Sequence, residues 1–147
     1  KLLIVGENIS YNNKNIVKLI SKFNLKDNVI IFRTRTNLDN FYSLLDIHLL
    51  SSISESFPNV VAESMFLGIP SISTDVGDVK YLVNNYGWLV PKNNPEIMCQ
   101  TIIDVIKFKS DIKQWQSIKK KCNEHIIKNF NIGVTIKKYN LCWEKKI

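Results

Sequence analysis

Short apolar runs and segments with helical apolar spacing take turns along residues 1–91 of the chain. The apolar runs predict strands over 2–6, 29–32, 46–51, 71–73 and 87–90, with the first buried and the last at an edge. The segments between them predict helices over 38–45, 59–67 and 79–83, and a first helix that Asn12 or Asn13 can cap and that runs to about residue 23. Alternating strands and helices form right-handed βαβ units, so the pattern predicts the α/β class, with a Rossmann-like parallel sheet flanked by helices. Ligands of such sheets bind at the carboxyl ends of the strands.

The pattern changes after Pro91, where apolar residues keep only helical spacing. Helices are predicted over 94–108, over 111–129 with Ser110 as the N-cap, and from 131 to the end. The sheet of the first part therefore gives way to a helical C-terminal tail.

The length of 147 residues is that of one domain, divided by this pattern into a βα core over 1–91 and a helical end over 92–147. Hydrophobic residues make up 45% and charged residues 22% of the chain, which is an ordinary globular balance. The net charge of +7 favours anionic partners, namely nucleotides, nucleic acids or acidic membrane surfaces.

Two glutamates, Glu55 and Glu63, flank a turn and the start of the helix predicted over 59–67. The free amides at that helix start, near Asn59, Val60 and Val61, suit a phosphate group. Glu63 follows one turn later and can accept hydrogen bonds from a ribose diol, while Glu55 can accept from a hydroxyl at the other end of the ligand. This arrangement fits a sugar–diphosphate–ribose. The alternative is that Glu63 is a solvated helix residue and Glu55 a turn residue.

The segment 51–90 resembles the donor-binding, C-terminal half of GT-B glycosyltransferases of the retaining family four, of the bacterial surface-polysaccharide type, whose mark is E-x7-E. The matching positions are Ser52, Glu55-Ser56-Phe57-Pro58, Glu63, Met65, Gly68-Ile69-Pro70, Thr74-Asp75-Val76-Gly77 and Gly87-Trp88-Leu89-Val90-Pro91. The resemblance implies that Glu63 binds the ribose and that Glu55, the candidate catalytic residue, contacts the donor sugar. It implies that the donor is also bound by Ser56, Phe57, Asn59, Val60 and Val61, largely through backbone amides.

The chain departs from the family pattern at the sugar end of this site. Ser56 stands where many members have Gly, Pro58 removes an amide, and Tyr81 occupies the place of a Glu. At the nucleotide end, Arg33 and Thr34 follow a predicted strand at the same sheet edge, where the family places the base. We expect uridine there in preference to guanosine, with a simple surface charge as the alternative for Arg33.

The resemblance implies a hexosyltransferase that moves a sugar from a nucleotide sugar to a hydroxyl acceptor, with retention and with no cofactor or metal required. No His, Asp or Glu cluster in the sequence suggests a metal site. The acceptor would be a glycan or a lipid-linked carrier, held by an N-terminal domain that is absent from this chain. The opening strand of the donor domain, with its Arg and Lys, is also missing, so we expect these 147 residues alone to be inactive.

Two other functions compete with this prediction. The chain could be a non-catalytic nucleotide-binding module, or a donor subunit that needs a partner chain. A basic nucleic-acid-binding domain is a third interpretation, but it leaves the glutamate pair unexplained, because carboxylates at a phosphate site weaken polyanion binding. We therefore expect no nucleic-acid partner.

Lysines gather on one face of the helix predicted over 111–129, at Lys113, Lys119, Lys120, Lys121 and Lys128. They form either a solvated face or a surface attracted to an anionic membrane that holds the acceptor. The sequence shows neither a run of membrane-spanning length nor a signal peptide, and its three cysteines have no metal spacing. These features predict a cytoplasmic protein, either free or peripheral at the inner face of the plasma membrane.

Overall fold

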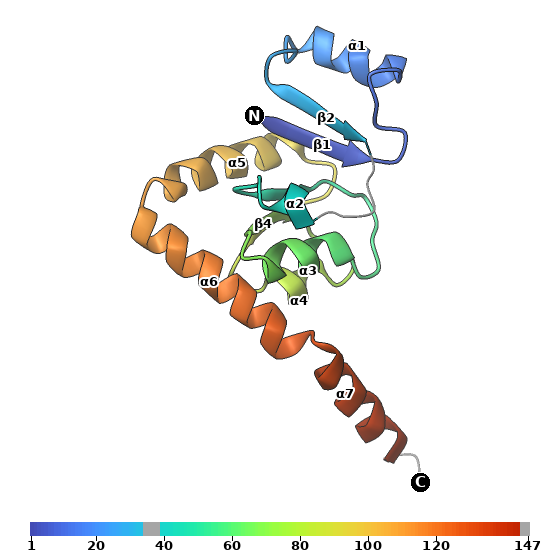
Figure 1. Ribbon diagram of the computed structural model, residues 1–147, viewed down its shortest axis with the longest axis vertical. Coiled ribbons are helices and arrows are strands. Elements are labelled where there is room, and N and C mark those ends of the chain that lie inside the picture. The colour runs from blue at the N-terminus through green and yellow to red at the C-terminus, as the bar shows by residue number, and fades with distance from the viewer. Residues whose placement is uncertain (34–38, 145–147) are drawn as a thin grey trace. The chain divides into compact units, whose positions relative to one another are not determined.

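The structure, a computed structural model, describes residues 1–33 and 39–144. Parallel strands flanked by helices confirm the predicted α/β class. The chain divides into two compact units, Lys1–Asp39 and Asn40–Ile147 (Figure 1). The predicted division of a single domain near residue 91 stays a prediction. The described strands form two separate sheets, and the helix that follows residue 91 packs on strands of the second sheet.

The first unit is a βαβ arrangement of β1 (Leu2–Gly6), α1 (Lys14–Lys22) and β2 (Val29–Arg33). The two strands pair in parallel along their whole length, from Leu2 opposite Val29 to Gly6 opposite Arg33. Of the two candidate caps, Asn12 and Asn13, it is Asn13 that caps α1 through its side-chain oxygen. Val29 is buried, but β1 has no fully buried residue, so the expectation of a buried first strand is wrong. The helix α1 buries none of its residues either.

The second unit is built on a parallel sheet in the order β3–β4–β5. Its strands are β3 (His48–Leu50), β4 (Ser71–Thr74) and β5 (Trp88–Val90). The four residues of central β4 are all buried, and β5 lies at the edge, as predicted. The helix α2 (Asp39–Tyr42) precedes the sheet, α3 (Asn59–Phe66) joins β3 to β4, and α4 (Val79–Val83) joins β4 to β5. The loops after β3 and β4 therefore begin at the same edge of the sheet.

Three further helices complete the second unit: α5 (Pro95–Lys109), α6 (Ile112–Asn129) and α7 (Ile132–Glu144). The helix α6 packs against α3 (Figure 1). Gly68 permits this approach, because its φ is +74° and an added Cβ would lie 3.3 Å from the carbonyl oxygen of Lys119. The N-cap of α6 is Asp111, whose carboxylate accepts a hydrogen bond from the Gln114 amide at 3.0 Å. The prediction of Ser110 as this cap is therefore wrong.

Two apolar clusters form the core of the second unit. The first cluster joins α3, α4 and α6 and contains Val61, Met65, Val76, Val79, Leu82, Val83, Cys122 and Ile126. The second cluster joins β4, β5, α5 and α6 and contains Ile72, Val90, Val105 and Trp115. Burial of this apolar surface is the main force that holds the helices to the sheet. It fixes α3, and with it the start of that helix, in a defined position.

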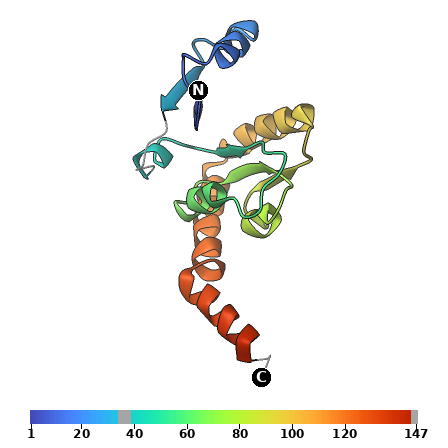
Figure 2. The ribbon, with the colours of Figure 1, turned by 90° about the vertical axis from the view of Figure 1, so that its right-hand side faces the viewer.

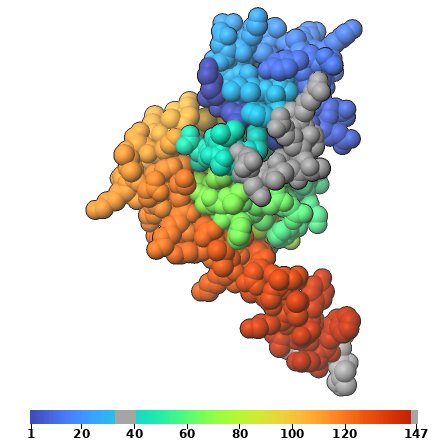
Figure 3. Space-filling view, in the orientation of Figure 1, coloured from blue at the N-terminus to red at the C-terminus, as the bar shows by residue number. Residues whose placement is uncertain are grey.

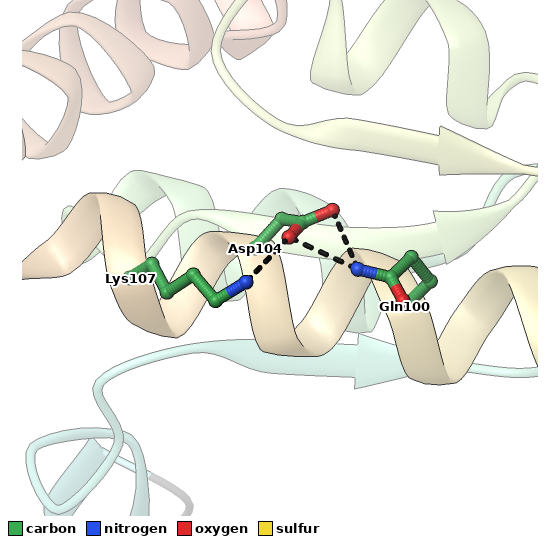
Figure 4. A network of polar contacts seen from close by, with 3 residues as sticks. All are labelled: Gln100, Asp104 and Lys107. Carbon is green, nitrogen blue, oxygen red and sulfur yellow. Dashed lines mark hydrogen bonds and ion pairs between the residues drawn. The ribbon is translucent and has the colours of Figure 1, made fainter.

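Two features of the helices lie on the surface, outside these clusters. On α5, Gln100 donates from its side-chain amide to both carboxylate oxygens of Asp104, at 3.1 Å each, and Lys107 pairs with one of them at 3.4 Å (Figure 4). The helix α7 continues beyond α6, away from the three-stranded sheet, and buries none of its described side chains (Figures 2 and 3). Neither feature contributes to the core.

Candidate functional site

The predicted strand, loop and helix around the two glutamates are present. The strand β3 ends at Leu50 and α3 begins at Asn59, one residue after the buried Pro58. Pro58 is the N-cap, with φ −76° and ψ 96°, and it offers no side-chain acceptor to the first amides of the helix. The helix start therefore keeps backbone donors that a ligand can use.

The first turn of α3 uses one of the three amides that the sequence suggested for an anion. The Val61 amide donates to the carbonyl oxygen of Pro58 at 3.0 Å. Within the described part of the chain, the amides of Asn59 and Val60 have no hydrogen-bond acceptor. Two adjacent backbone donors at the positive end of a helix are thus open to a negatively charged group.

Glu63 lies on α3, one turn after these amides, and its side chain is exposed. Its carboxylate oxygen Oε2 accepts a hydrogen bond of 2.9 Å from the hydroxyl of Tyr42. Tyr42 is the last residue of α2 and is only 4% exposed. Burial, and secondarily the hydrogen bond and charge of Glu63, raise the pKa of Tyr42 above its ordinary value, so the hydroxyl keeps its proton and donates.

Tyr42 was not among the residues that the sequence pattern suggested for the site. It lies 21 positions before Glu63, so no local spacing connects the two residues. The available signal was a tyrosine in an apolar segment, because a buried tyrosine usually finds a partner for its hydroxyl. The sequence does not say which residue that partner is.

Glu55 is half-buried, and its loop is held by the loop that follows β4. Gly77 has a φ of +52°, and an added Cβ would collide with the carbonyl oxygens of Glu55 and Ser56. Next to it, the Asp78 amide donates to the Ser56 carbonyl at 2.9 Å, and Thr74 donates from its hydroxyl to the Ser52 carbonyl at 2.6 Å. The backbone around Glu55 is therefore fixed from the neighbouring strand, as a preorganised site requires.

Phe57 directs its side chain into a different part of the second unit. The ring is 40% exposed and packs against Phe130, with the ring centroids 6.0 Å apart. It borders a hollow of about 790 Å³, lined by Phe57, Asp78, Lys80, Tyr81, Asn84, Asn85, Leu89, His125, Asn129, Phe130 and Lys138. The side chain of Phe57 thus packs on Phe130, the C-cap residue of α6, which leaves its backbone as the part that the resemblance assigns to the donor.

The two residues expected near the nucleobase belong to another part of the chain. Arg33, predicted to open a loop, is instead the last residue of β2 in the first unit. Thr34 lies outside the described residues. The prediction of a base site at these two positions therefore stays a prediction.

The histidines have structural partners. His48 shares a hydrogen bond of 2.9 Å between its Nδ1 and the Ser71 hydroxyl, and burial lowers its pKa to about 4. His125 is hydrogen-bonded through Nε2 to the Tyr81 carbonyl oxygen at 3.0 Å.

In residues 1–33 and 39–144, no group of three or more His, Cys, Asp or Glu could hold a metal ion. Over the same residues, no helix is both long and apolar enough to cross a membrane.

Comparison with known families identifies a match over most of the chain. The family described as "Glycosyl transferases group 1" matches residues 1–107. Among curated proteins, N-acetyl-alpha-D-glucosaminyl L-malate synthase of Bacillus anthracis is 24% identical over 141 residues. That alignment covers 95% of the chain and 36% of the Bacillus protein.

Solved structures share the fold. A glycosyltransferase of Rickettsia africae superposes with a TM-score of 0.84 at 24% identity, over 97% of the chain and 39% of that protein. Anabaena HepE in complex with UDP gives a TM-score of 0.79 at 20% identity, over 99% of the chain and 40% of HepE. HepE has also been solved with UDP-glucose. The fold is that of GT-B glycosyltransferases, and the chain spans well under half the length of these relatives.

Proposed function

Because this chain belongs to the family of group 1 glycosyl transferases, we propose that it binds the nucleotide-sugar donor of a retaining glycosyltransferase. The protein would transfer a hexose from that donor to a hydroxyl of a glycan or a lipid-linked carrier, in the synthesis of a bacterial surface polysaccharide. The chain covers 36–40% of the length of the three relatives compared above, which supports an acceptor-binding part outside these 147 residues.

The observation that carries this proposal is the arrangement at the start of α3. The open amides of Asn59 and Val60 suit the diphosphate, and the Glu63 carboxylate stands one turn away, where ribose hydroxyls can donate to it. Each hydrogen bond between a hydroxyl and a carboxylate contributes about 1.5–3 kcal/mol. The combination of donors for phosphate and an acceptor for a diol is the chemistry of a nucleoside diphosphate.

The same amides have a role in the reaction. As the bond between the sugar and the diphosphate breaks, negative charge grows on the leaving diphosphate. The partial positive charge of the α3 start stabilises this charge without reorganisation, which lowers the barrier. Glu55 would contact the donor sugar, and the hydrogen bonds from Thr74 and Asp78 to its loop support a fixed position for it. Retention and independence from a metal rest on the resemblance of the E-x7-E segment.

Uridine is the proposed base. UDP and UDP-glucose are the ligands in the HepE complexes, whose fold this chain shares.

The proposed location is the cytoplasm, with the enzyme peripheral at the inner face of the plasma membrane. Contact with the membrane would use the exposed lysines of α6, among them Lys113, Lys121 and Lys128. These would attract anionic lipids around a lipid-linked acceptor.

Thermal unfolding with a panel of nucleotides tests the proposal. We expect UDP and UDP-hexoses to raise the melting temperature more than ADP, GDP or inorganic diphosphate do, because a ligand stabilises the folded state to which it binds. Inorganic diphosphate controls for simple anion binding by a chain with a net charge of +7. Equal stabilisation by every anion in the panel would leave only electrostatic attraction and would contradict a nucleotide site.

A further inference from the structure

The contact between Tyr42 and Glu63 joins a buried residue to an exposed one. Tyr42 is 4% exposed and Glu63 is exposed on α3, yet the Tyr42 hydroxyl lies 2.9 Å from Oε2 of Glu63. The tyrosine ring is fixed by its surroundings, including an edge-on contact with Phe41 at 6.2 Å between ring centroids. The hydroxyl is therefore a rigid donor, held beneath a side chain that would otherwise be mobile.

In this hydrogen bond the Tyr42 hydroxyl is the donor and the Glu63 carboxylate is the acceptor. The hydroxyl of Tyr42 keeps its proton, because burial and the nearby carboxylate oppose its ionisation. An ionised carboxylate only accepts, and its two oxygens offer about four acceptor positions. Oε2 has one of them occupied by Tyr42, and within the described part of the chain Oε1 has no hydrogen-bond partner.

A glutamate on a helix surface normally samples several rotamers, and fixing it in one of them costs conformational entropy. A ligand that must select one rotamer carries this cost at the moment it binds. A hydrogen bond that already holds one oxygen reduces the cost and directs the second oxygen outward.

We propose that Tyr42 is a positioning residue, whose hydroxyl holds Oε2 of Glu63 so that the remaining acceptor positions of this carboxylate meet the ribose hydroxyls of the donor nucleotide. This inference rests on the proposed function. It adds that discrimination between ribose and deoxyribose depends on a residue that does not itself touch the nucleotide.

A purely structural role for the contact is the competing explanation, because the same bond also connects α2 to α3. The two roles differ in what the loss of the hydroxyl does. If the hydroxyl has only a structural role, its loss should lower the affinity for all nucleotides to the same extent. If it positions Glu63, its loss should lower the affinity most for the nucleotide with the complete ribose diol.

The experiment is calorimetric titration with UDP and with 2′-deoxy-UDP. The variants are Tyr42→Phe, which keeps the ring, Glu63→Gln, and the double variant. Tyr86→Phe is the matched control, because Tyr86 is a partly buried tyrosine packed on the core cluster of α3, α4 and α6. Thermal unfolding of each variant verifies that it is folded.

We expect Tyr42→Phe to weaken UDP binding by roughly tenfold, within the range for a hydrogen bond to a charged group. It should also lower the preference for UDP over 2′-deoxy-UDP, and it should add little when Glu63→Gln is already present. Tyr86→Phe should leave affinity and preference as they are.

Two results would overturn the inference while the proposed function stands, provided that Glu63→Gln binds UDP more weakly than the wild type. The first is that Tyr42→Phe binds UDP with wild-type affinity. The second is that Tyr42→Phe loses the same factor of affinity for UDP and for 2′-deoxy-UDP. Unchanged UDP binding in Glu63→Gln would instead contradict the proposed function itself.

Discussion

The backbone amide of Asp78 donates a hydrogen bond of 2.9 Å to the carbonyl oxygen of Ser56. This bond connects the loop after β4 to the loop after β3, the loop that carries Glu55. The neighbouring Gly77 makes the approach possible, because its φ is +52° and no side chain fits between it and the two carbonyl oxygens it faces. The position of the proposed sugar-binding carboxylate thus depends on a glycine on the adjacent strand's loop.

Replacement of that glycine provides the first prediction. We expect Gly77→Ala to lower the free energy of unfolding by roughly 2–4 kcal/mol, since it adds both left-handed strain and a collision with the Glu55 and Ser56 carbonyls. Urea unfolding measures the change. Gly133→Ala is the control, because Gly133 lies in the first turn of α7 without a positive φ, and an added Cβ would approach a side-chain atom, Oδ1 of Asn131 at 3.1 Å, in place of backbone carbonyls. Equal stability of the two variants would show that the packing of these loops is looser than the structure indicates.

Substitutions of Glu55 and Glu63 should affect the binding of different ends of the donor. We predict that Glu55→Gln binds UDP as the wild type does but binds the matching UDP-hexose more weakly, because the sugar loses a carboxylate acceptor worth about 1.5–3 kcal/mol. Competition titrations with both ligands measure the difference. A loss of UDP affinity in Glu55→Gln equal to its loss of UDP-hexose affinity would remove the assignment of this residue to the sugar.

Protonation of His48 should make the stability of the protein depend on pH. Its pKa is lowered by burial from 6.5 to about 4, so the folded protein keeps this ring neutral while the unfolded chain protonates it. Its contribution to the free energy of unfolding is constant above pH 6.5, falls as the pH drops towards 4, and amounts to roughly 3 kcal/mol in total.

Urea unfolding between pH 7 and pH 4 tests this dependence, with His48→Asn as the variant that lacks the ring. The wild type should lose more stability than the variant over that interval. Parallel curves for the two proteins would mean that the ring of His48 is solvated in the folded state.

The share of its relatives that the chain spans, 36–40% of the three compared above, provides a functional prediction. We expect these 147 residues alone to transfer no sugar to an acceptor, because transfer needs the acceptor hydroxyl within about 3–3.5 Å of the anomeric carbon. The assay incubates UDP-hexoses with lipid-linked and free glycan acceptors, first with this chain and then with an N-terminal acceptor domain joined to it. Efficient transfer by the 147 residues would show that the acceptor site is already present in them.

The local features of the fold could be predicted from the sequence, because they depend on neighbouring residues. The helix start after Pro58, an asparagine cap on α1 and the strand around Ile72 all follow from apolar positions, turn residues and capping residues. Ser110 and Asp111 are adjacent and are both good N-cap residues, so composition alone did not distinguish them.

Features that depend on packing between distant segments could not be predicted. The first strand is as apolar as a buried one, but burial depends on what covers it, and β1 buries no residue completely. The bond from Tyr42 to Glu63 and the fit of Gly77 against Glu55 both join residues that are more than 20 positions apart. For this reason the sequence suggested candidate ligand-binding residues but not the residues that hold them in place.

Calorimetric titration of UDP is the most direct test of the proposal that the start of α3 and Glu63 bind the nucleoside diphosphate of the donor. We expect measurable binding by the wild type, a loss of roughly tenfold or more in Glu63→Gln, and no change in Glu96→Gln, since Glu96 is an exposed glutamate of α5. Equal UDP affinity in all three proteins, or no UDP binding by the wild type, would contradict it.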